Sequence, residues 1–294
     1  MLLRGAVDLH VHSYPDLTTR SIDDLRMGRL AREAGMAGFV LKSHYAPTAE
    51  RATVVNLAIP EAGAMGAIVL NHFVGGLNAL AVEAFGRSGG KVVYLPTQDA
   101  INEAGVLDEW DSSKPLPPYL QIKKDLQDRG RLREPIALMD ADGALVPALH
   151  EVLDVVLEFD LVLSTGHVSP AEAVAVVREA SSRGIDRILV THPESPHIGA
   201  TVGQQQEMAA CGALLERCFA YLQTDADAER LFDTVRATGV ENNVFSSDLG
   251  MISREDPVEG LARFAAMASS AGFSDEELHH LLVDGPRTVC GLDS

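Results

Sequence analysis

Short apolar runs and amphipathic segments alternate along the whole of this 294-residue chain. The apolar runs are mostly unbroken Val, Ile, Leu, Phe and Ala, which is typical of parallel strands covered on both faces. Few folds accommodate many parallel strands that are each followed by a helix. Eight runs are predicted as strands, at 6–10, 38–42, 67–72, 91–96, 161–165, 187–191, 213–216 and 243–247.

The segments between these runs carry helix signals. Ser21-Ile22-Asp23-Asp24 predicts a helix start and Gly35 its end. Ser169 precedes a proline suited to the first helical position, and Ser274 and Glu277 fit a capping box. Further helices are predicted at 48–61, 76–87, 146–157, 204–211, 225–238 and 258–271.

Two architectures satisfy a strand–helix unit repeated eight times: a closed (β/α)8 TIM barrel and an open doubly wound sheet. No strand is followed by a glycine-rich GxGxxG loop, which weakens the second. We therefore expect one α/β barrel domain over residues 1–294, a length that such barrels often use for a single domain.

Residues 97–147 interrupt the alternation of strands and helices and are predicted as an insertion after strand four. They are polar, rich in proline and irregular, and they end in a hairpin at 136–147 with an Asp-Gly turn. In a barrel this segment follows a strand on the face where active sites form, so it could be a lid. A structural excursion or an oligomer contact explains the segment equally well.

Composition limits the partners. The net charge of −18 argues against nucleic acid and anionic membranes, and no apolar run approaches the roughly 20 residues of a membrane span. We expect no signal peptide, because the first residues run directly into the first strand. Three widely spaced cysteines fit reduced thiols, so a cytoplasmic protein with a small-molecule substrate is expected. A homo-oligomer is left open.

Six of the ten histidines lie at the predicted carboxyl ends of strands. His10 and His12 are one residue apart, and alternation along a strand points both side chains the same way. In a barrel the carboxyl ends of all strands converge on one pocket. The six are His10, His12, His44, His72, His167 and His192, and Asp248 follows the last strand.

Imidazoles and a carboxylate around one pocket suit a divalent cation. Zinc is favoured, with manganese, iron or cobalt as alternatives, and one or two ions could be held. Such a cation lowers the pKa of water and polarises a carbonyl or phosphoryl oxygen. Asp248 is the candidate to accept and return the proton.

These residues resemble the ligand pattern of the amidohydrolase superfamily, metal-dependent (β/α)8-barrel hydrolases. Members carry an HxH motif after strand one, histidines after strands five and six, and an aspartate after strand eight. The matching residues, in order, are His10, His12, His167, His192 and Asp248. The resemblance covers nearly the whole chain, to Asp284-Gly285-Pro286-Arg287, and implies that these five residues bind metal and that Asp248 is catalytic.

The chain departs from that pattern in one place. Two-metal members place a carboxylated lysine or a glutamate after strand four, where this sequence reads Tyr94-Leu95-Pro96-Thr97-Gln98. Lys42, one of five lysines, ends strand two and is the candidate substitute. Desolvation near a cation would lower its pKa and favour a carbamate. Alternatively, Lys42 binds an anionic group of the substrate.

Other polar residues receive lesser roles. His44 and His72 are candidates for substrate binding, extra ligands or support of the ligands. Glu194 and Glu216 could support the histidines from behind, and a solvated or structural role is favoured over a catalytic role for each. Asp8 is expected to anchor its own strand end. His150, His279 and His280 are expected on helix surfaces.

We therefore expect a metal-dependent hydrolase that cleaves a C–N bond in an amide, imide or cyclic amide, or a lactone ester. Two alternatives stay open. One is a phosphoesterase similar to the polymerase-and-histidinol-phosphatase family, although Ser43 stands where that family has aspartate and Gly250 where it has histidine. The other is a non-catalytic barrel that binds a metal or ligand.

Overall fold

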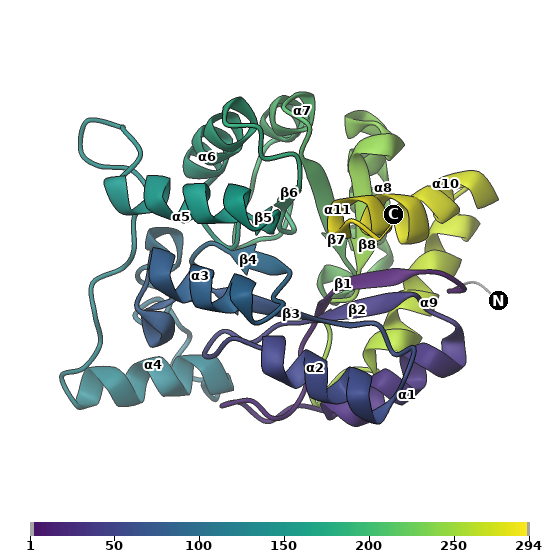
Figure 1. The fold of residues 1–294 in the computed structure, drawn as a ribbon, viewed down its shortest axis with the longest axis horizontal. Helices are drawn as coiled ribbons and strands as arrows, with labels where there is room; N and C mark the ends of the chain where they lie inside the picture. Colours follow the sequence, from purple (N-terminus) through teal and green to yellow (C-terminus); the bar gives the residue numbers. More distant parts are fainter. Residues whose placement is uncertain (1–2, 293–294) are drawn as a thin grey trace.

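The computed structural model describes residues 3–292, and these residues form a sheet of eight strands (Figure 1). Every strand pairs in parallel with the next one along the chain, in the order β1 to β8. The bounds lie within a few residues of those predicted. They are β1 (Val7–Val11), β2 (Gly38–Leu41), β3 (Ala64–Val69), β4 (Val92–Tyr94), β5 (Val162–Ser164), β6 (Ile188–Val190), β7 (Leu214–Cys218) and β8 (Asn243–Ser246).

The first strand and the chain leaving the last strand close the barrel. The Asp248 amide donates to the His10 carbonyl at 2.9 Å, and the His12 amide donates to the Leu249 carbonyl at 2.8 Å. One carboxylate oxygen of buried Asp8 accepts from the His10 amide at 3.1 Å and from the Ser247 amide at 3.0 Å. The predicted anchoring role of Asp8 is therefore confirmed, and the barrel is favoured over the open sheet.

Helices cover the outside of the sheet between consecutive strands, and each predicted helix is present. The signals at Ser169 and Ser274 form capping boxes, and Gly35 ends its helix with φ of 74°. Asp23, not Ser21, caps the first helix. The helices are α1 (Asp24–Ala34), α2 (Ala49–Ala58), α3 (Ala79–Arg87), α5 (Pro147–Glu158), α6 (Pro170–Ser182), α7 (Val202–Ala210), α8 (Asp225–Thr238), α9 (Pro257–Ser270), α10 (Asp275–His279) and α11 (Gly285–Cys290).

Residues 3–292 also contain five short helical turns. They are η1 (His72–Val74), η2 (Ile101–Glu103), η3 (Phe219–Tyr221), η4 (Val240–Asn242) and the π-helical turn η5 (His280–Asp284), which joins α10 to α11. The prediction was wrong in placing His72 on strand three. The strand ends at Val69, and His72 begins η1, where the Gly75 amide donates back to the His72 carbonyl at 3.0 Å.

The segment between β4 and α5 is more ordered than predicted. It contains η2 and α4 (Pro118–Asp128), which stands apart from the barrel in Figure 1. Pro118 occupies the first helical turn, where a proline lacks no needed hydrogen bond, so this proline starts a helix instead of disrupting one. The predicted hairpin is reduced to one bridge between Met139 and Leu145 around the Asp-Gly turn.

Alternation along the strands separates two apolar layers. Residues such as Ile68, Val93 and Leu163 pack outward with the helices. Their neighbours in sequence pack with one another: Ala67, Val92, Val162, Leu189 and Val244. No helix in residues 3–292 combines the length and apolar character needed to cross a membrane.

The outer layer near the chain's end generates a stability prediction. The ring of Phe264 on α9 stacks on that of Phe245 on β8 with centroids 4.0 Å apart, and both side chains are fully buried. Phe264→Ala should reduce the free energy of unfolding by about 3–5 kcal/mol, because it removes buried area and leaves a cavity. Urea denaturation measures this loss.

Leu80→Ala on α3 is the control, because Leu80 is 77% exposed and its truncation should cost less than about 0.5 kcal/mol. Equal effects of the two substitutions would contradict the packing described here.

Candidate metal centre and active site

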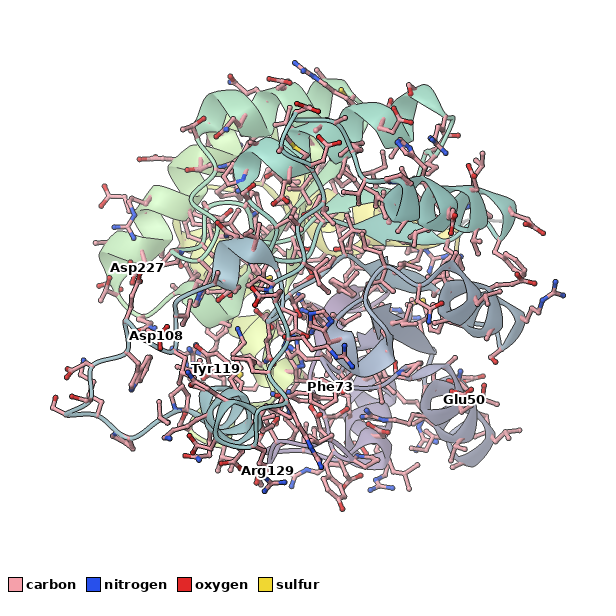
Figure 2. The ribbon with its side chains drawn as sticks, turned by 90° about the vertical axis from the view of Figure 1, so that its left-hand side faces the viewer. Glu50, Phe73, Asp108, Tyr119, Arg129 and Asp227 are labelled. Carbon is pink, nitrogen blue, oxygen red and sulfur yellow. The ribbon has the colours of Figure 1, made fainter. Side chains whose placement is uncertain are left out.

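A cavity of about 540 Å³ opens at the carboxyl ends of the strands. Residues that follow β1, β2, β4, β5, β6, β7 and β8 line it, and so do residues of α4 and the segment before it. Figure 2 shows this end of the molecule, with Tyr119 of α4 and Phe73 on it. The charged, imidazole and aromatic residues that line the cavity include His12, Arg20, Lys42, His44, Glu103, Tyr119, His167, His197, Tyr221 and Asp248.

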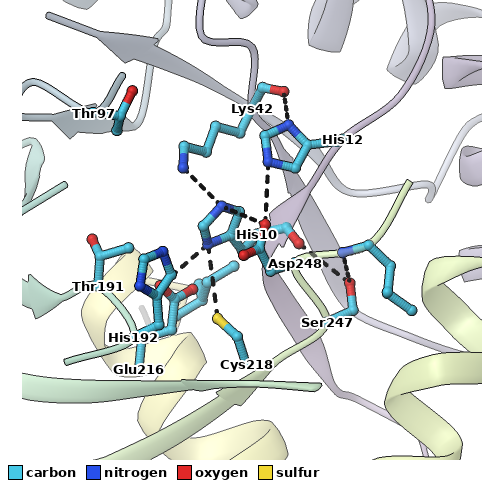
Figure 3. Close-up of polar contacts among 12 residues, drawn as sticks. His10, His12, Lys42, Thr97, Thr191, His192, Glu216, Cys218, Ser247 and Asp248 are labelled. Carbon is cyan, nitrogen blue, oxygen red and sulfur yellow. Dashed lines mark hydrogen bonds and ion pairs between the residues drawn. The ribbon is translucent and has the colours of Figure 1, made fainter. Parts of the chain in front are cut away.

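His10, His12 and Asp248 meet at the base of the site (Figure 3). One oxygen of Asp248 lies 3.0 Å from His10 Nε2 and 3.2 Å from His12 Nε2. His10 lies on β1 and His12 directly follows its last residue, and both rings face Asp248, as their spacing predicted. Asp248 adopts a left-handed φ of 49°, which aspartate tolerates better than most residues.

The far side of each of these two rings is also held. His10 Nδ1 lies 3.3 Å from a carboxylate oxygen of Glu216 on β7, and His12 Nδ1 lies 3.1 Å from the Lys42 carbonyl. These contacts orient both rings so that Nε2 faces Asp248. Glu216 therefore supports a site histidine from behind, as the sequence suggested.

Lys42 belongs to the same cluster. Its Nζ lies 2.8 Å from His10 Nε2 and 4.5 Å from the centre of the Tyr94 ring, and only 1% of the residue is exposed. Burial lowers the pKa of Lys42, and the charges of Asp248 and Glu216 oppose that shift. The amine of Lys42 therefore loses its proton more readily than the amine of an exposed lysine.

His192 and His167 extend the cluster toward the mouth of the cavity. The His192 ring lies 6.0 Å from His10 and 5.0 Å from His167, measured between centroids. Ser195 Oγ lies 3.1 Å from His192 Nδ1, and a carboxylate oxygen of Glu103 lies 3.0 Å from His167 Nδ1. All five residues expected from the resemblance therefore lie in one site, although only three are in direct contact.

Cys218 is a further candidate ligand. Possible ligand atoms of His10, Cys218 and Asp248 lie within 4.8 Å of one another. However, the Cys218 sulfur lies 3.9 Å from Nδ1 of His10, on the ring's side away from Asp248. Burial raises the pKa of this thiol well above its ordinary value, and a protonated thiol is a poor ligand. His12 is the better third ligand.

The two candidates for substrate binding fall in different places. His44 lines the cavity, with its ring 5.0 Å from that of His12 and its Nδ1 2.8 Å from Thr97 Oγ1. His72 does not line this cavity, and its Nε2 lies 2.8 Å from the Glu134 carbonyl. The position of His72 on η1 does not support the predicted role.

The sequence did not point to several residues of the cavity, and four of them are charged, aromatic or imidazole groups close to the site. Glu103 is buried against His167, and Tyr221 places its hydroxyl 3.5 Å from His192 Nε2. Arg20 and His197 line the wall. None of the four directly follows a strand or belongs to a spaced motif, so the sequence carried no signal for them. Glu194, a candidate support, instead pairs with buried Arg217.

Burial sets the electrostatics of the cluster. It lowers the pKa of His12, His44 and His192 well below the ordinary value, which favours neutral imidazoles. Burial alone would raise the pKa of Asp248, but His10, His12 and Lys42 together hold it well below its usual range. The site therefore combines neutral nitrogen donors with an ionised carboxylate.

The chain belongs to a family of unknown function, DUF6282, whose pattern matches residues 5–216. No curated protein matches. Solved structures with a similar fold include a putative 2-pyrone-4,6-dicarboxylic acid hydrolase from Pseudomonas putida, with 14% identity, 99% and 98% of the two chains covered and a TM-score of 0.59.

Two others are similar over comparable lengths. The probable dipeptidase PvdM from Pseudomonas aeruginosa is 12% identical, with 97% of this chain and 94% of the other covered and a TM-score of 0.64. An organophosphorus hydrolase from Deinococcus radiodurans is 15% identical, with 98% and 92% covered and a TM-score of 0.60. At such identities the likeness establishes the fold. Nothing in these comparisons supports the weaker similarity to the polymerase-and-histidinol-phosphatase family.

The buried histidines generate a pH prediction for the metal-free protein. The pKa of His44 is lower in the folded state than the ordinary 6.5, so the unfolded chain binds more protons below that pH. The free energy of unfolding should therefore fall as pH decreases below about 6.5, by up to about 1.4 kcal/mol per pH unit for each such histidine. Urea denaturation across this range measures the slope.

His44→Gln should reduce this slope by up to about 1.4 kcal/mol per pH unit, which corresponds to the uptake of one proton. His279→Gln is the control, because that side chain is 58% exposed on α10 and lies outside the buried cluster. A slope that is the same in all three proteins would contradict the assignment.

Proposed function

We propose that this protein is a metal-dependent hydrolase that cleaves a C–N bond in an amide, imide or cyclic amide, or a lactone ester, of a small molecule. The observation that carries the proposal is the convergence of His10 Nε2 and His12 Nε2 on one oxygen of Asp248. This trio lies at the base of a cavity at the carboxyl ends of the barrel strands, where barrel enzymes have their active sites.

The residues present fit a divalent cation of the zinc type. Neutral imidazole nitrogens and an ionised carboxylate are the donors that such cations prefer, and the pKa shifts of His12 and Asp248 favour those forms. Glu216 and the Lys42 carbonyl hold the rings from behind, as supporting partners of metal-binding histidines do. His10, His12 and Asp248 would hold the ion, and His167 and His192 would complete the set.

A bound cation would polarise a carbonyl oxygen and lower the pKa of water. Asp248 is placed to take a proton from water and to return it to the leaving nitrogen or oxygen, because its side chain is in the cluster and also lines the cavity. His44 faces the same space and can position the substrate. Tyr119 forms part of the wall from α4, which supports a lid role for the 97–147 insertion.

The similar structures support attack at a carbonyl carbon. The names of two of them specify a dipeptidase and a pyrone-dicarboxylic acid hydrolase, and both names imply cleavage next to a carbonyl. A cavity of about 540 Å³ suits a small molecule, and the net charge of −18 disfavours nucleic acid.

Asp248→Asn tests the catalytic role. The substituted protein should still bind zinc, because His10, His12 and the remaining amide oxygen are retained, but turnover should fall at least about a hundredfold through loss of the proton acceptor. Two measurements test this. Mass spectrometry gives the zinc content, and hydrolysis of a panel of lactones, cyclic amides and dipeptides gives the turnover.

Asp233→Asn is the matched control, because Asp233 is an exposed residue of α8, and this variant should keep both zinc and activity. A chelator should abolish activity, and added zinc or manganese should restore it. Undiminished turnover in Asp248→Asn would remove the assigned role, and a protein that binds no divalent cation would overturn the proposal.

We further propose that Lys42 carries a carbamate that supplies the bridging oxygen ligands missing after β4. Its neutral amine, favoured by burial, would attack carbon dioxide, forming an N–C bond and releasing one proton. The contact of Nζ with His10 Nε2 at 2.8 Å places such a group among the proposed ligands. Zinc stoichiometry would then reach two ions per chain.

Carbon-13 NMR of zinc-loaded protein in labelled bicarbonate tests this modification. A carbamate signal should be present in the unsubstituted protein, lost in Lys42→Met and kept in Lys91→Met, where the lysine lies before β4 at the opposite end of the barrel. Absence of the signal from the zinc-loaded protein would show that Lys42 acts as an amine.

A further inference from the structure

Arg20 forms a built feature of the cavity wall that the proposed chemistry does not use. It lies in the loop between β1 and α1, and its side chain is only 9% exposed although it lines the cavity. Nε donates to one oxygen of Asp16 at 2.7 Å, and Nη2 forms an ion pair with the same oxygen, also at 2.7 Å. A long cationic side chain is thus held in one position at the wall of the cavity.

Asp16 is itself fixed from other directions. Its side chain is completely buried, and its second oxygen accepts from the Leu17 amide at 2.7 Å and from Ser43 Oγ at 3.1 Å. Ser43 lies between Lys42 and His44, so the support for Arg20 is tied to the segment that carries two residues of the site.

The contact with Asp16 uses one edge of the guanidinium and leaves the other edge free. A guanidinium has five N–H donors, and the Asp16 oxygen accepts from Nε and lies beside Nη2. Within residues 3–292, no acceptor is recorded for Nη1. Nη1 and the second proton of Nη2 form a flat two-donor edge, which matches the geometry of a carboxylate.

The charges around the cavity also admit an anion. Two acidic residues line it, and both are already paired: Asp248 with His10 and His12, and Glu103 with His167. An incoming anion therefore meets no unpaired carboxylate on the wall.

The geometry points to Arg20 as a specificity-determining residue that binds a carboxylate of the substrate, with Asp16 as its positioning residue. The substrate class is then a carboxylate-bearing lactone or cyclic amide, whose charged group lies against the β1–α1 loop while the scissile carbon faces Asp248. The role of Arg20 in binding a substrate rests on the proposed function. Binding of a free carboxylate to Arg20 would not require turnover.

Binding of glutarate, measured by isothermal titration calorimetry, tests the site separately from catalysis. Arg20→Met should weaken glutarate binding by about tenfold or more, because a charge-assisted pair is lost, and Arg20→Lys should restore it only in part. Dimethyl glutarate, which lacks the charges, should bind none of these proteins. All measurements are made on metal-stripped and zinc-loaded protein, so that carboxylate binding to the metal is recognised.

Arg87→Met is the matched control, because Arg87 also pairs through Nε and Nη2 with a carboxylate four residues earlier, but on the exposed face of α3. Its glutarate affinity should equal that of the unsubstituted protein. If Arg20→Met is unstable because Asp16 is left buried and unpaired, the double variant Asp16→Asn, Arg20→Met removes that charge and should show the same loss.

Equal glutarate affinity in the folded Arg20 variants and the unsubstituted protein, or no saturable glutarate binding to the latter, would overturn the inference. Binding of inorganic phosphate in preference to glutarate, with the same dependence on Arg20, would overturn the carboxylate assignment in favour of a phosphorylated ligand. Zinc binding that persists in Arg20→Met distinguishes loss of this site from failure of the proposed metal centre.

Discussion

The hydrogen bond from the Asp248 amide to the His10 carbonyl is the contact on which the site depends. It closes the barrel and, in the same step, brings the residue after the last strand to the end of the first. Asp8 reinforces this seam by binding the Ser247 amide, a residue 239 positions away. The proposed ligand set therefore exists only in the closed barrel, so that the closure which completes the fold also assembles the candidate chemistry.

Such a site is costly to bury, and the surrounding contacts show how the cost is met. Lys42, Glu216 and Asp248 are ionisable groups in or next to the barrel interior, and each has a partner in the His10–His12 pair. Removing any one member leaves another buried polar group unmatched, which is expensive in a low dielectric. A bound cation would add positive charge next to the carboxyl groups of Glu216 and Asp248.

Local periodicity predicted most of the fold and the centre of the site. Alternation on one strand placed His10 and His12 together, and the rule that active sites lie at the carboxyl ends of strands placed Lys42, His44 and Asp248 beside them. Other residues could not be found in this way. His72 lies just beyond a strand that ends three residues earlier than its apolar run suggests, and Glu103 reaches His167 from a turn within a long insertion.

Arg20 shows why the remainder of the cavity could not be predicted. Its position depends on a buried carboxylate that is in turn held by the serine between Lys42 and His44, a connection between two loops that leaves no trace in spacing or composition. The cavity also contains two kinds of residues that come from different parts of the fold. The groups proposed for chemistry are carried on strand ends that the barrel holds rigidly, whereas the groups proposed for substrate choice are carried on loops and on α4. Loop sequences can therefore change the ligand while the barrel keeps the reaction centre, which is consistent with one fold serving hydrolases of such different names.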